Sequence, residues 1–472
     1  MALKELIQYL PEVKKPVEKK LAFNQKLKWT LIVLGFFFVM YNIKLYGLSR
    51  NALERFDFLS TILGTDFGAI ISLGIGPIVT SSIILQLLVG SGILSLDTKS
   101  EEGKKLFQGI QKLGTMFFIV FEACIFVLMK GLEANPGFES VVIFQLILGG
   151  LAIMFMDEVV AKWGFGSGVS LFIVAGVALQ LFIGLFQFVG ADGSNCLINF
   201  GETPCSGRIL VIIQSIINGD PTSALLAFAV ILVTVLIFLG VVWAQSLKVE
   251  IPLSYDRLRG YGVKWPLQFF YASVLPVILV AALAANMQLF GSLFETWLGR
   301  PTFLGGFQNG QPVSGLAFWI GSPNLLQAAI TGSLLTSQIF QAIFHILFYA
   351  VFAMIFSIFW VKTTGMDPAG QAKNIASSGL QMAGFRKDPR IIESVLSRYI
   401  FPLTVMGGLA IGLLASVANL LGALTSGTSI LLAVMILYQL YQNIAKQHSL
   451  DMNPTMRKMM ETTFVRHESD YA

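Results

Sequence analysis

The stretch Gly74-Ile-Gly-Pro-Ile-Val-Thr-Ser-Ser-Ile-Ile-Leu-Gln-Leu-Leu88 is an apolar segment that opens with two glycines and a proline. Because Pro77 lacks a backbone N–H and has a fixed φ, it suits the first turn of a helix, and we expect a helix to begin near Gly74. Non-helical backbone at membrane depth is tolerated only where it is buried in protein or lines a water-filled cavity. An ordinary proline kink is the alternative interpretation of this segment taken alone. The broken apolar span nevertheless indicates a path through a bilayer.

The composition is that of a polytopic membrane protein. The chain has 472 residues, of which 55% are hydrophobic and 12% are charged. A water-soluble globule carries about 25% charged residues, so half of the usual charge is missing. Apolar runs long enough to cross a hydrocarbon core of about 30 Å recur along the chain. Ten such spans are predicted, at residues 29–47, 73–91, 112–130, 140–156, 168–188, 222–243, 269–290, 337–361, 399–421 and 428–446.

The distribution of basic residues predicts the orientation of these spans. With the N-terminus in the cytosol, 26 of the 32 Lys and Arg residues fall on the inner side. This asymmetry follows the positive-inside rule with both termini cytosolic. The sequence therefore predicts a multi-pass protein of the cell (plasma) membrane, or of the endoplasmic reticulum if the source is eukaryotic.

Two inner loops, residues 244–268 and 362–398, are long and basic. The first carries Arg257 and Arg259, and the second carries Arg386 and Lys387, in both cases beside glycines. Positive-inside bias or binding to anionic lipid headgroups would also explain this charge. The length of the loops favours docking of something large and acidic, such as RNA phosphate.

Two of the three cysteines share one outer loop. Cys196 and Cys205 lie nine residues apart and are flanked by Asp, Gly, Asn and Pro. On the oxidising side of a membrane such a pair is expected to form a disulfide. Cys124 lies in the third span, where we expect it to be a small buried hydrophobe.

No catalytic or cofactor motif is present: the chain lacks HExxH, CxxC, GxGxxG, a Walker loop and a nucleophile elbow. We therefore expect no enzymatic activity, no cofactor and no metal site. The spans carry few polar or ionisable side chains, mainly Gln86, Glu122, Asn286 and His345. An ion-coupled transporter normally has several acids or bases across its spans, so the scarcity favours a passive, apolar-lined pore. A secondary transporter with inverted repeats and an intramembrane enzyme are the alternatives.

Six motifs of the chain resemble those of the SecY family, the protein-conducting channel of the Sec translocon, and the resemblance is archaeal in character. They are residues 74–88, Gly166-Ser-Gly-Val-Ser-Leu-Phe-Ile-Val-Ala-Gly176, Val274-Leu-Pro-Val-Ile-Leu279, residues 379–387 ending in Gly-Phe-Arg-Lys, Arg398-Tyr-Ile-Phe-Pro-Leu-Thr-Val-Met406 and Gly427-Thr-Ser-Ile-Leu-Leu432. The resemblance covers almost the whole chain. It implies an all-α membrane protein whose ten helices form two pseudo-symmetric five-helix halves, like a clamshell.

The resemblance divides the chain into an N-terminal half and a C-terminal half with connecting segments. The expected parts are a cytosolic amphipathic segment at residues 1–28, the N-terminal half at 29–190, an outer loop at 191–221, the C-terminal half at 222–447 and a cytosolic tail at 448–472.

The resemblance also implies an hourglass channel with a narrow ring at the membrane centre. An uncharged aliphatic constriction sheds water, so it blocks ions without any large movement of a gate. The family often has isoleucine where this chain has valine or leucine, so the ring is expected to be slightly looser at its two valines. Helix packing is the commoner role of such residues and is the competing interpretation. The ring residues carried over are Ile75, Val79, Val169, Ile173, Ile278 and Leu432.

By the same resemblance, a short helix at residues 53–68 is the plug that closes the outer funnel. Its helically spaced apolar residues are Phe56, Leu59, Ile62 and Leu63. A helix that lies on the bilayer surface is the alternative interpretation.

A lateral gate is implied between the second and third spans on one side and the seventh and eighth on the other. Signal sequences and transmembrane helices would pass through it into lipid. The candidate polar residues of this gate are Thr80, Gln86, Glu122 and Asn286.

The implied partners are a translating ribosome, nascent polypeptides and two small single-span subunits, one of which clamps the two halves together. The ribosome would dock on the basic loops, mainly through Arg257, Arg259, Arg386 and Lys387.

Overall fold

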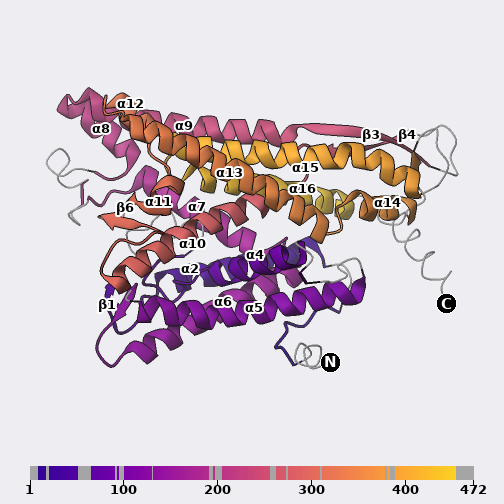
Figure 1. Cartoon of the computed structure of the whole chain (residues 1–472), viewed down its shortest axis with the longest axis horizontal. Helices are drawn as coiled ribbons and strands as arrows, with labels where there is room; N and C mark the ends of the chain where they lie inside the picture. Colours follow the sequence, from indigo (N-terminus) through magenta and orange to yellow (C-terminus); the bar gives the residue numbers. More distant parts are fainter. Residues whose placement is uncertain are drawn as a thin grey trace.

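The computed structural model is largely helical, and within its described residues ten helices correspond to the ten predicted spans. It describes residues 9–17, 21–51, 65–90, 93–94, 100–129, 131–190, 195–196, 205–255, 262–272, 275–308, 311–377, 380–382 and 389–452. The ten helices lie along the long axis of the molecule (Figure 1). They are α2 (Phe23–Asn42), α4 (Gly76–Gly90), α5 (Glu101–Leu128), α6 (Glu139–Trp163), α7 (Gly168–Phe186), α9 (Pro221–Ser246), α10 (Leu275–Leu298), α13 (Thr336–Thr363), α15 (Pro389–Leu420) and α16 (Gly427–Met452).

Eight of these helices, among the residues described, are long and apolar enough to cross a membrane. The two others are α2, which carries Lys26 and Lys28 in its first turns, and α4, which has only 15 residues. Helix α4 begins at Gly76, two residues beyond the expected start. Pro77 is its second residue, where the missing N–H removes no intrahelical hydrogen bond. The short α4 therefore matches the expectation of a span whose first part is not helical.

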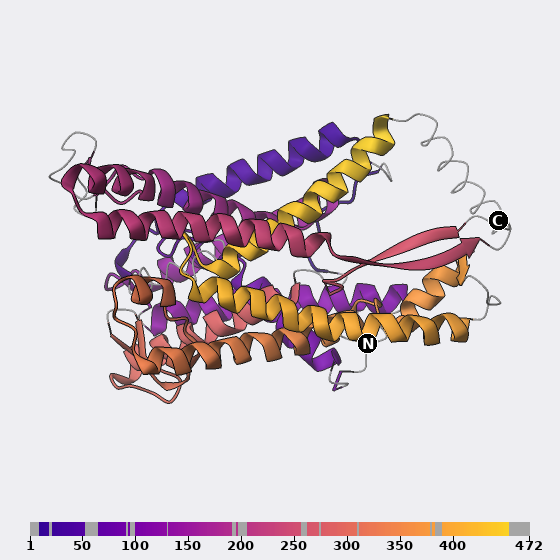
Figure 2. The same ribbon diagram turned by 90° about the horizontal axis from the view of Figure 1, so that it is seen from above.

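One hydrophobic cluster runs through both halves of the bundle. Helices α2 and α4–α7 form the first half, and the helices from α9 onward form the second. At the junction of the halves, α4 contacts both α10 and α13, while α7 contacts α16. The view from above shows α16 running obliquely between α2 and α15 and crossing α9 (Figure 2). Consequently α4, α7, α10, α13 and α16 meet at the junction of the halves, where their side chains can line a path.

The two long basic loops, residues 244–268 and 362–398, contain β-structure that the sequence analysis did not predict. Strands β3 (Lys248–Tyr255), β4 (Gly262–Gln268) and β7 (Leu380–Met382) form an antiparallel sheet in the order β4-β3-β7. The sheet and the short helix α14 (Pro368–Ser377) pack against the start of α15 through a second apolar cluster. They extend from one end of the bundle (Figure 1). The two loops are therefore one structural unit, although Arg257, Arg259, Arg386 and Lys387 lie outside the described residues.

The opposite end of the bundle carries shorter elements. Strand β1 (Leu48–Asn51) pairs with β2 (Leu132–Ala134), and β5 (Gly306–Gln308) pairs with β6 (Gln311–Ser314). Helices α8 (Arg208–Asn218), α11 (Gly315–Ile320) and α12 (Leu325–Ile330) lie at the same end (Figure 1). The predicted plug residues Phe56, Leu59, Ile62 and Leu63 lie outside the described residues.

A disulfide joins Cys196 to Cys205 at this end, with the two Cα atoms 5.4 Å apart. Both cysteines are buried, and the N–H of Cys205 donates to Oε1 of Gln214 in α8 at 3.0 Å. The bond thus connects the loop after α7 to the start of the α8–α9 hairpin. Cys124 is free and only partly buried.

Removal of this disulfide is expected to loosen α8 without unfolding the bundle. The double variant Cys196→Ser with Cys205→Ser should lose about 2–3 kcal/mol of local stability, because the bond restrains a short loop. Hydrogen exchange of the α8 amides, compared between the parent and the variant, measures this loss. Peptide mapping of parent protein under non-reducing conditions is the control. Recovery of both thiols free from native membranes would contradict the prediction.

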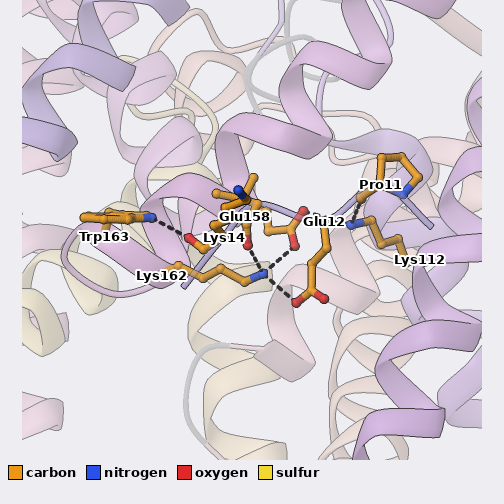
Figure 3. A network of polar contacts seen from close by, with 8 residues as sticks. Pro11, Glu12, Lys14, Lys112, Glu158, Lys162 and Trp163 are labelled. Carbon is orange, nitrogen blue, oxygen red and sulfur yellow. Dashed lines mark hydrogen bonds and ion pairs between the residues drawn. The ribbon is translucent and has the colours of Figure 1, made fainter. Parts of the chain in front are cut away.

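At the sheet-bearing end, the N-terminal segment at residues 9–17 is tied to α5 and α6 by a polar network (Figure 3). The carboxylate of Glu158 on α6 accepts from Lys112 of α5 and from Lys162 of α6, both at 2.8 Å. Lys162 also donates to Glu12 at 2.6 Å, and Lys112 donates to the carbonyl oxygen of Pro11 at 2.5 Å. Glu158 is therefore the acid that the α5 and α6 cations share.

Candidate functional site

A cavity of about 420 Å³ lies between helices of both halves. Its aliphatic wall includes Val79 of α4, Val169 of α7 and Ile278 of α10, which are three of the six predicted ring residues. The polar part of the wall is contributed by Ser82, Gln86, Gln111, Asp157, Ser167, Ser170, Gln439 and Asn443.

The position of the wall residues along their helices shows at which end the cavity lies. Helices α4, α6 and α13 run toward the end that carries β3 and β4, and they contribute residues near their C-termini, such as Gln86, Asp157 and Trp360. Helices α7 and α10 run the opposite way and contribute residues at their N-termini, such as Val169 and Leu275. The cavity therefore occupies the half of the bundle nearest the β3–β4–β7 sheet.

All six predicted ring residues belong to one hydrophobic cluster. Ile75, Val79, Ile173, Ile278 and Leu432 are buried in it, and Val169 is partly buried and packs against it. The structure thus gathers aliphatic side chains from α4, α7, α10 and α16 at the junction of the two halves, and three of them face the cavity.

Three of the four predicted gate residues meet at Thr80. The Nδ2 group of Asn286 on α10 donates to the Thr80 hydroxyl at 3.3 Å. The same hydroxyl is hydrogen-bonded to the buried carboxyl group of Glu122 on α5. These contacts connect α4, α5 and α10 across the junction between the halves.

The fourth predicted gate residue, Gln86, does not join this cluster. Its Nε2 group donates to the Ser82 hydroxyl at 3.0 Å on the same helix, and its side chain lines the cavity. Its Oε1 atom is buried and has no hydrogen-bond partner among the described residues. Gln86 therefore belongs to the polar wall of the cavity.

The sequence analysis missed several polar wall residues. Gln439 and Asn443 lie four residues apart on α16, so they share one face of that helix, and this spacing is the signal that would have identified them. Asp157 lies one residue beyond the predicted fourth span, so the hydropathy pattern does not mark it as an intramembrane acid. Within the described parts of the chain, no group of three or more His, Cys, Asp or Glu side chains is placed to hold a metal ion.

Comparison with protein families and with curated proteins gives full-length matches. A family model described as SecY matches residues 69–441. The protein translocase subunit SecY of Methanothermobacter thermautotrophicus is 42% identical over 460 residues, which cover 96% of this chain and 97% of that protein. The corresponding subunit of Methanocaldococcus jannaschii is 39% identical over 457 residues, covering 96% of this chain and 98% of that protein.

Solved structures match equally well over the whole chain. One described as the structure of a protein conducting channel has a TM-score of 0.82 at 38% identity, covering 96% of this chain and 98% of that chain. Sec61 in a canine ribosome-channel complex from the endoplasmic reticulum has a TM-score of 0.79 at 38% identity, with the same coverage. The predicted ten-helix channel fold is confirmed by these likenesses, and the chain belongs to the SecY family.

Proposed function

We propose how this member of the SecY family, a pore-forming subunit of a protein translocation channel, passes an unfolded polypeptide. The polypeptide enters the cavity and crosses the bilayer through a ring formed by the six aliphatic residues. This proposal rests on one observation: Val79, Val169 and Ile278, from three helices of both halves, line the same cavity. Aliphatic side chains make no hydrogen bonds with a passing segment, so they discriminate little among its residues. They also shed water, so the closed ring excludes ions. Residues 53–68 would plug the far side.

Lateral release of apolar segments would proceed between α4 with α5 on one side and α10 with α13 on the other. The Thr80–Asn286 hydrogen bond supports this assignment because it joins α4 to α10, and the Thr80–Glu122 contact joins α4 to α5. A hydrogen bond of this kind contributes about 1 kcal/mol net. A signal sequence is itself an apolar helix. When it inserts between the separated helices, the burial of its apolar surface compensates for the loss of this hydrogen bond.

The end that carries the β3–β4–β7 sheet would face the cytosol in a plasma membrane, with both termini on that side. The charge asymmetry along the chain supports this orientation. The sheet also joins the two basic loops, since Tyr255 of β3 pairs with Leu380 of β7. In the sequence, Arg257 and Arg259 follow β3 closely, and Arg386 and Lys387 follow β7 closely. These positions support a single basic surface that binds ribosomal RNA. One of the solved structures similar to this chain is described as a ribosome-channel complex. Small single-span subunits would complete the translocon.

A stalled nascent chain should crosslink to the ring. A photo-crosslinking residue placed at position 278 is expected to react with a secretory polypeptide that is arrested halfway through the channel. Position 142 is the matched control, since Val142 is fully buried on α6 and does not line the cavity. A secondary transporter would give no crosslink at position 278. Equal yields at positions 278 and 142 would contradict the proposed path.

Reversal of the charge at Arg386 is expected to weaken ribosome binding about tenfold, because a guanidinium group that contacts phosphate is replaced by a repelling carboxylate. The Arg257→Glu variant should show a smaller loss. Binding of purified channel to ribosomes over a range of salt concentrations measures both the affinity and its salt dependence.

The control for this charge reversal is Arg300→Glu, which changes the same charge at the opposite end of the bundle. Its ribosome affinity should equal that of the parent. Unchanged binding by the Arg386→Glu variant would favour a purely topological role for the basic loops.

A further inference from the structure

Helices α7 and α16 are the last spans of the two halves, and they begin in the same way. Each starts at a glycine, Gly168 or Gly427, and each carries a predicted ring residue five positions later, Ile173 or Leu432. Both of these ring residues are completely buried. The depth and rotation of the first turn of each helix therefore determine which side chain reaches the ring.

Both starting glycines lie against the backbone of the preceding span. A Cβ atom at Gly168 would collide with the Cα atom of Asp157 on α6, and one at Gly427 would collide with the backbone of Ala418 on α15. No side chain fits at either position unless the two helices move apart. Each ring-bearing helix thus starts in direct contact with its predecessor.

A side chain of the preceding span also caps each of these helices. Oδ1 of Asp157 accepts the N–H of Val169 at 2.9 Å, and the N–H of Gly168 bonds the same carboxyl group. Oδ1 of Asn419 accepts the N–H of Thr428 at 2.8 Å. In both halves, therefore, the residue directly after the glycine donates its N–H to a side-chain oxygen of the preceding span. The first N–H groups of a helix have no partner within it, so these caps fix the depth and rotation of the first turn.

The orientation of the Asn419 amide is itself fixed by His345 on α13. The ring of His345 contacts the carbonyl oxygen of Ile320 through Nδ1 at 2.6 Å. Since a carbonyl oxygen only accepts, Nδ1 carries the proton and Nε2 is the acceptor. The Nδ2 atom of Asn419 lies 3.5 Å from Nε2 and donates to it, which turns Oδ1 toward Thr428.

We propose that Asp157 and Asn419 are positioning residues for the pore ring, one in each half of the channel. Each cap joins a ring-bearing helix to the preceding span, α7 to α6 and α16 to α15. Val169 and Ile173 then move with the first half, and Leu432 moves with the second, when the halves part. This inference rests on the proposed function, because it assumes that these aliphatic residues form the constriction.

The test measures resting ion conductance of the assembled channel in planar bilayers, together with its thermal stability. Asp157→Leu and Asn419→Leu remove the capping acceptor and are expected to raise the resting open probability about tenfold, as loss of a helix N-cap allows. Asp157→Asn keeps a side-chain oxygen and should stay within about twofold of the parent. Asn419→Ala and Asp157→Ala replace any Leu variant that fails to fold.

The matched control is Asp220→Leu. Asp220 caps α9 by accepting the N–H groups of Thr222 at 3.2 Å and Ser223 at 3.4 Å, and α9 carries no ring residue. Its loss should lower thermal stability and leave conductance unchanged. The positive control is Ile278→Asn, which places a polar group in the proposed ring itself. The positioning role is overturned if this variant conducts while the folded Asp157 and Asn419 variants are as silent as Asp220→Leu. If Ile278→Asn is also silent, the proposed pore itself is wrong.

Discussion

Ile278→Asn is expected to turn the closed channel into one that leaks ions at rest, with a conductance at least about tenfold above the parent. Ile278 is only 2% exposed, belongs to the aliphatic cluster at the junction of the halves and lines the cavity. An amide group there gains about 1–3 kcal/mol by keeping water rather than remaining dry and unpaired. A wetted constriction passes ions that a dry one excludes. Val79→Ser should act in the same direction through α4.

Single-channel current in planar bilayers measures this effect on purified, monodisperse protein. Ile278→Val is the conservative control, since it keeps the surface aliphatic and should remain silent. Val280→Asn is the packing control: Val280 is buried two residues further along α10 but does not line the cavity. It should lower thermal stability without adding conductance. A stable Ile278→Asn channel that carries no current would show that Ile278 has a packing role only.

The positions of the spans could be predicted because the membrane imposes a simple pattern on the sequence. An apolar run must match the bilayer thickness, and a proline near its start limits where the helix begins, as Pro77 does for α4. The predicted starts of α5 and α15 were about ten residues late, since these helices begin at Glu101 and Pro389. Their first turns carry charged residues beyond the apolar run, and a hydropathy window detects only the apolar part.

The β3–β4–β7 sheet could not be predicted in the same way. Strand β7 has three residues and pairs with Leu253, Ser254 and Tyr255, which lie more than a hundred positions earlier in the chain. Strand β3 alternates charged and apolar residues only over its first half, and Pro252 interrupts it. Pairing between segments so far apart leaves no local signal in a single sequence.

The candidate site was predictable where a motif gave it and not where packing gave it. Val79, Val169 and Ile278 were identified from motifs, and the structure places them on one cavity wall. The Thr80–Asn286 contact joins two spans whose facing surfaces periodicity alone does not reveal. Asp157 and Asn419 act on helices other than their own, so their partners become visible only when α6 is packed on α7 and α15 on α16.

Glu158→Gln is expected to cost about 1–3 kcal/mol of stability, because it leaves the partly buried Lys112 and Lys162 without their shared counter-charge. The side chains of Lys112, Glu158 and Lys162 are only 17%, 16% and 14% exposed. Both lysines keep their contacts with the N-terminal segment, but carbonyl oxygens and Glu12 offset only part of two cationic charges. The ends of α5 and α6 should therefore separate more easily, and with them the anchorage of residues 9–17.

Glu12→Gln is the matched control, since it makes the same change in a side chain that is 62% exposed. Exposed pairs contribute about 0–1 kcal/mol, so its effect should be small. The hydrogen bond from Lys162 lowers the pKa of Glu12, so that small contribution is present at neutral pH and is lost as the pH falls through the lowered pKa.

Thermal unfolding of the purified channel and limited proteolysis of residues 9–17 measure the effect of Glu158→Gln. The double variant Glu158→Gln with Lys162→Met should regain part of the lost stability, because it removes one of the two cations that have lost their shared counter-charge. An equal loss from Glu158→Gln and Glu12→Gln would mean that solvent already screens this network. The N-terminal segment would then be held by its backbone contacts, such as the hydrogen bond from Trp163 to the Lys14 carbonyl oxygen at 2.9 Å.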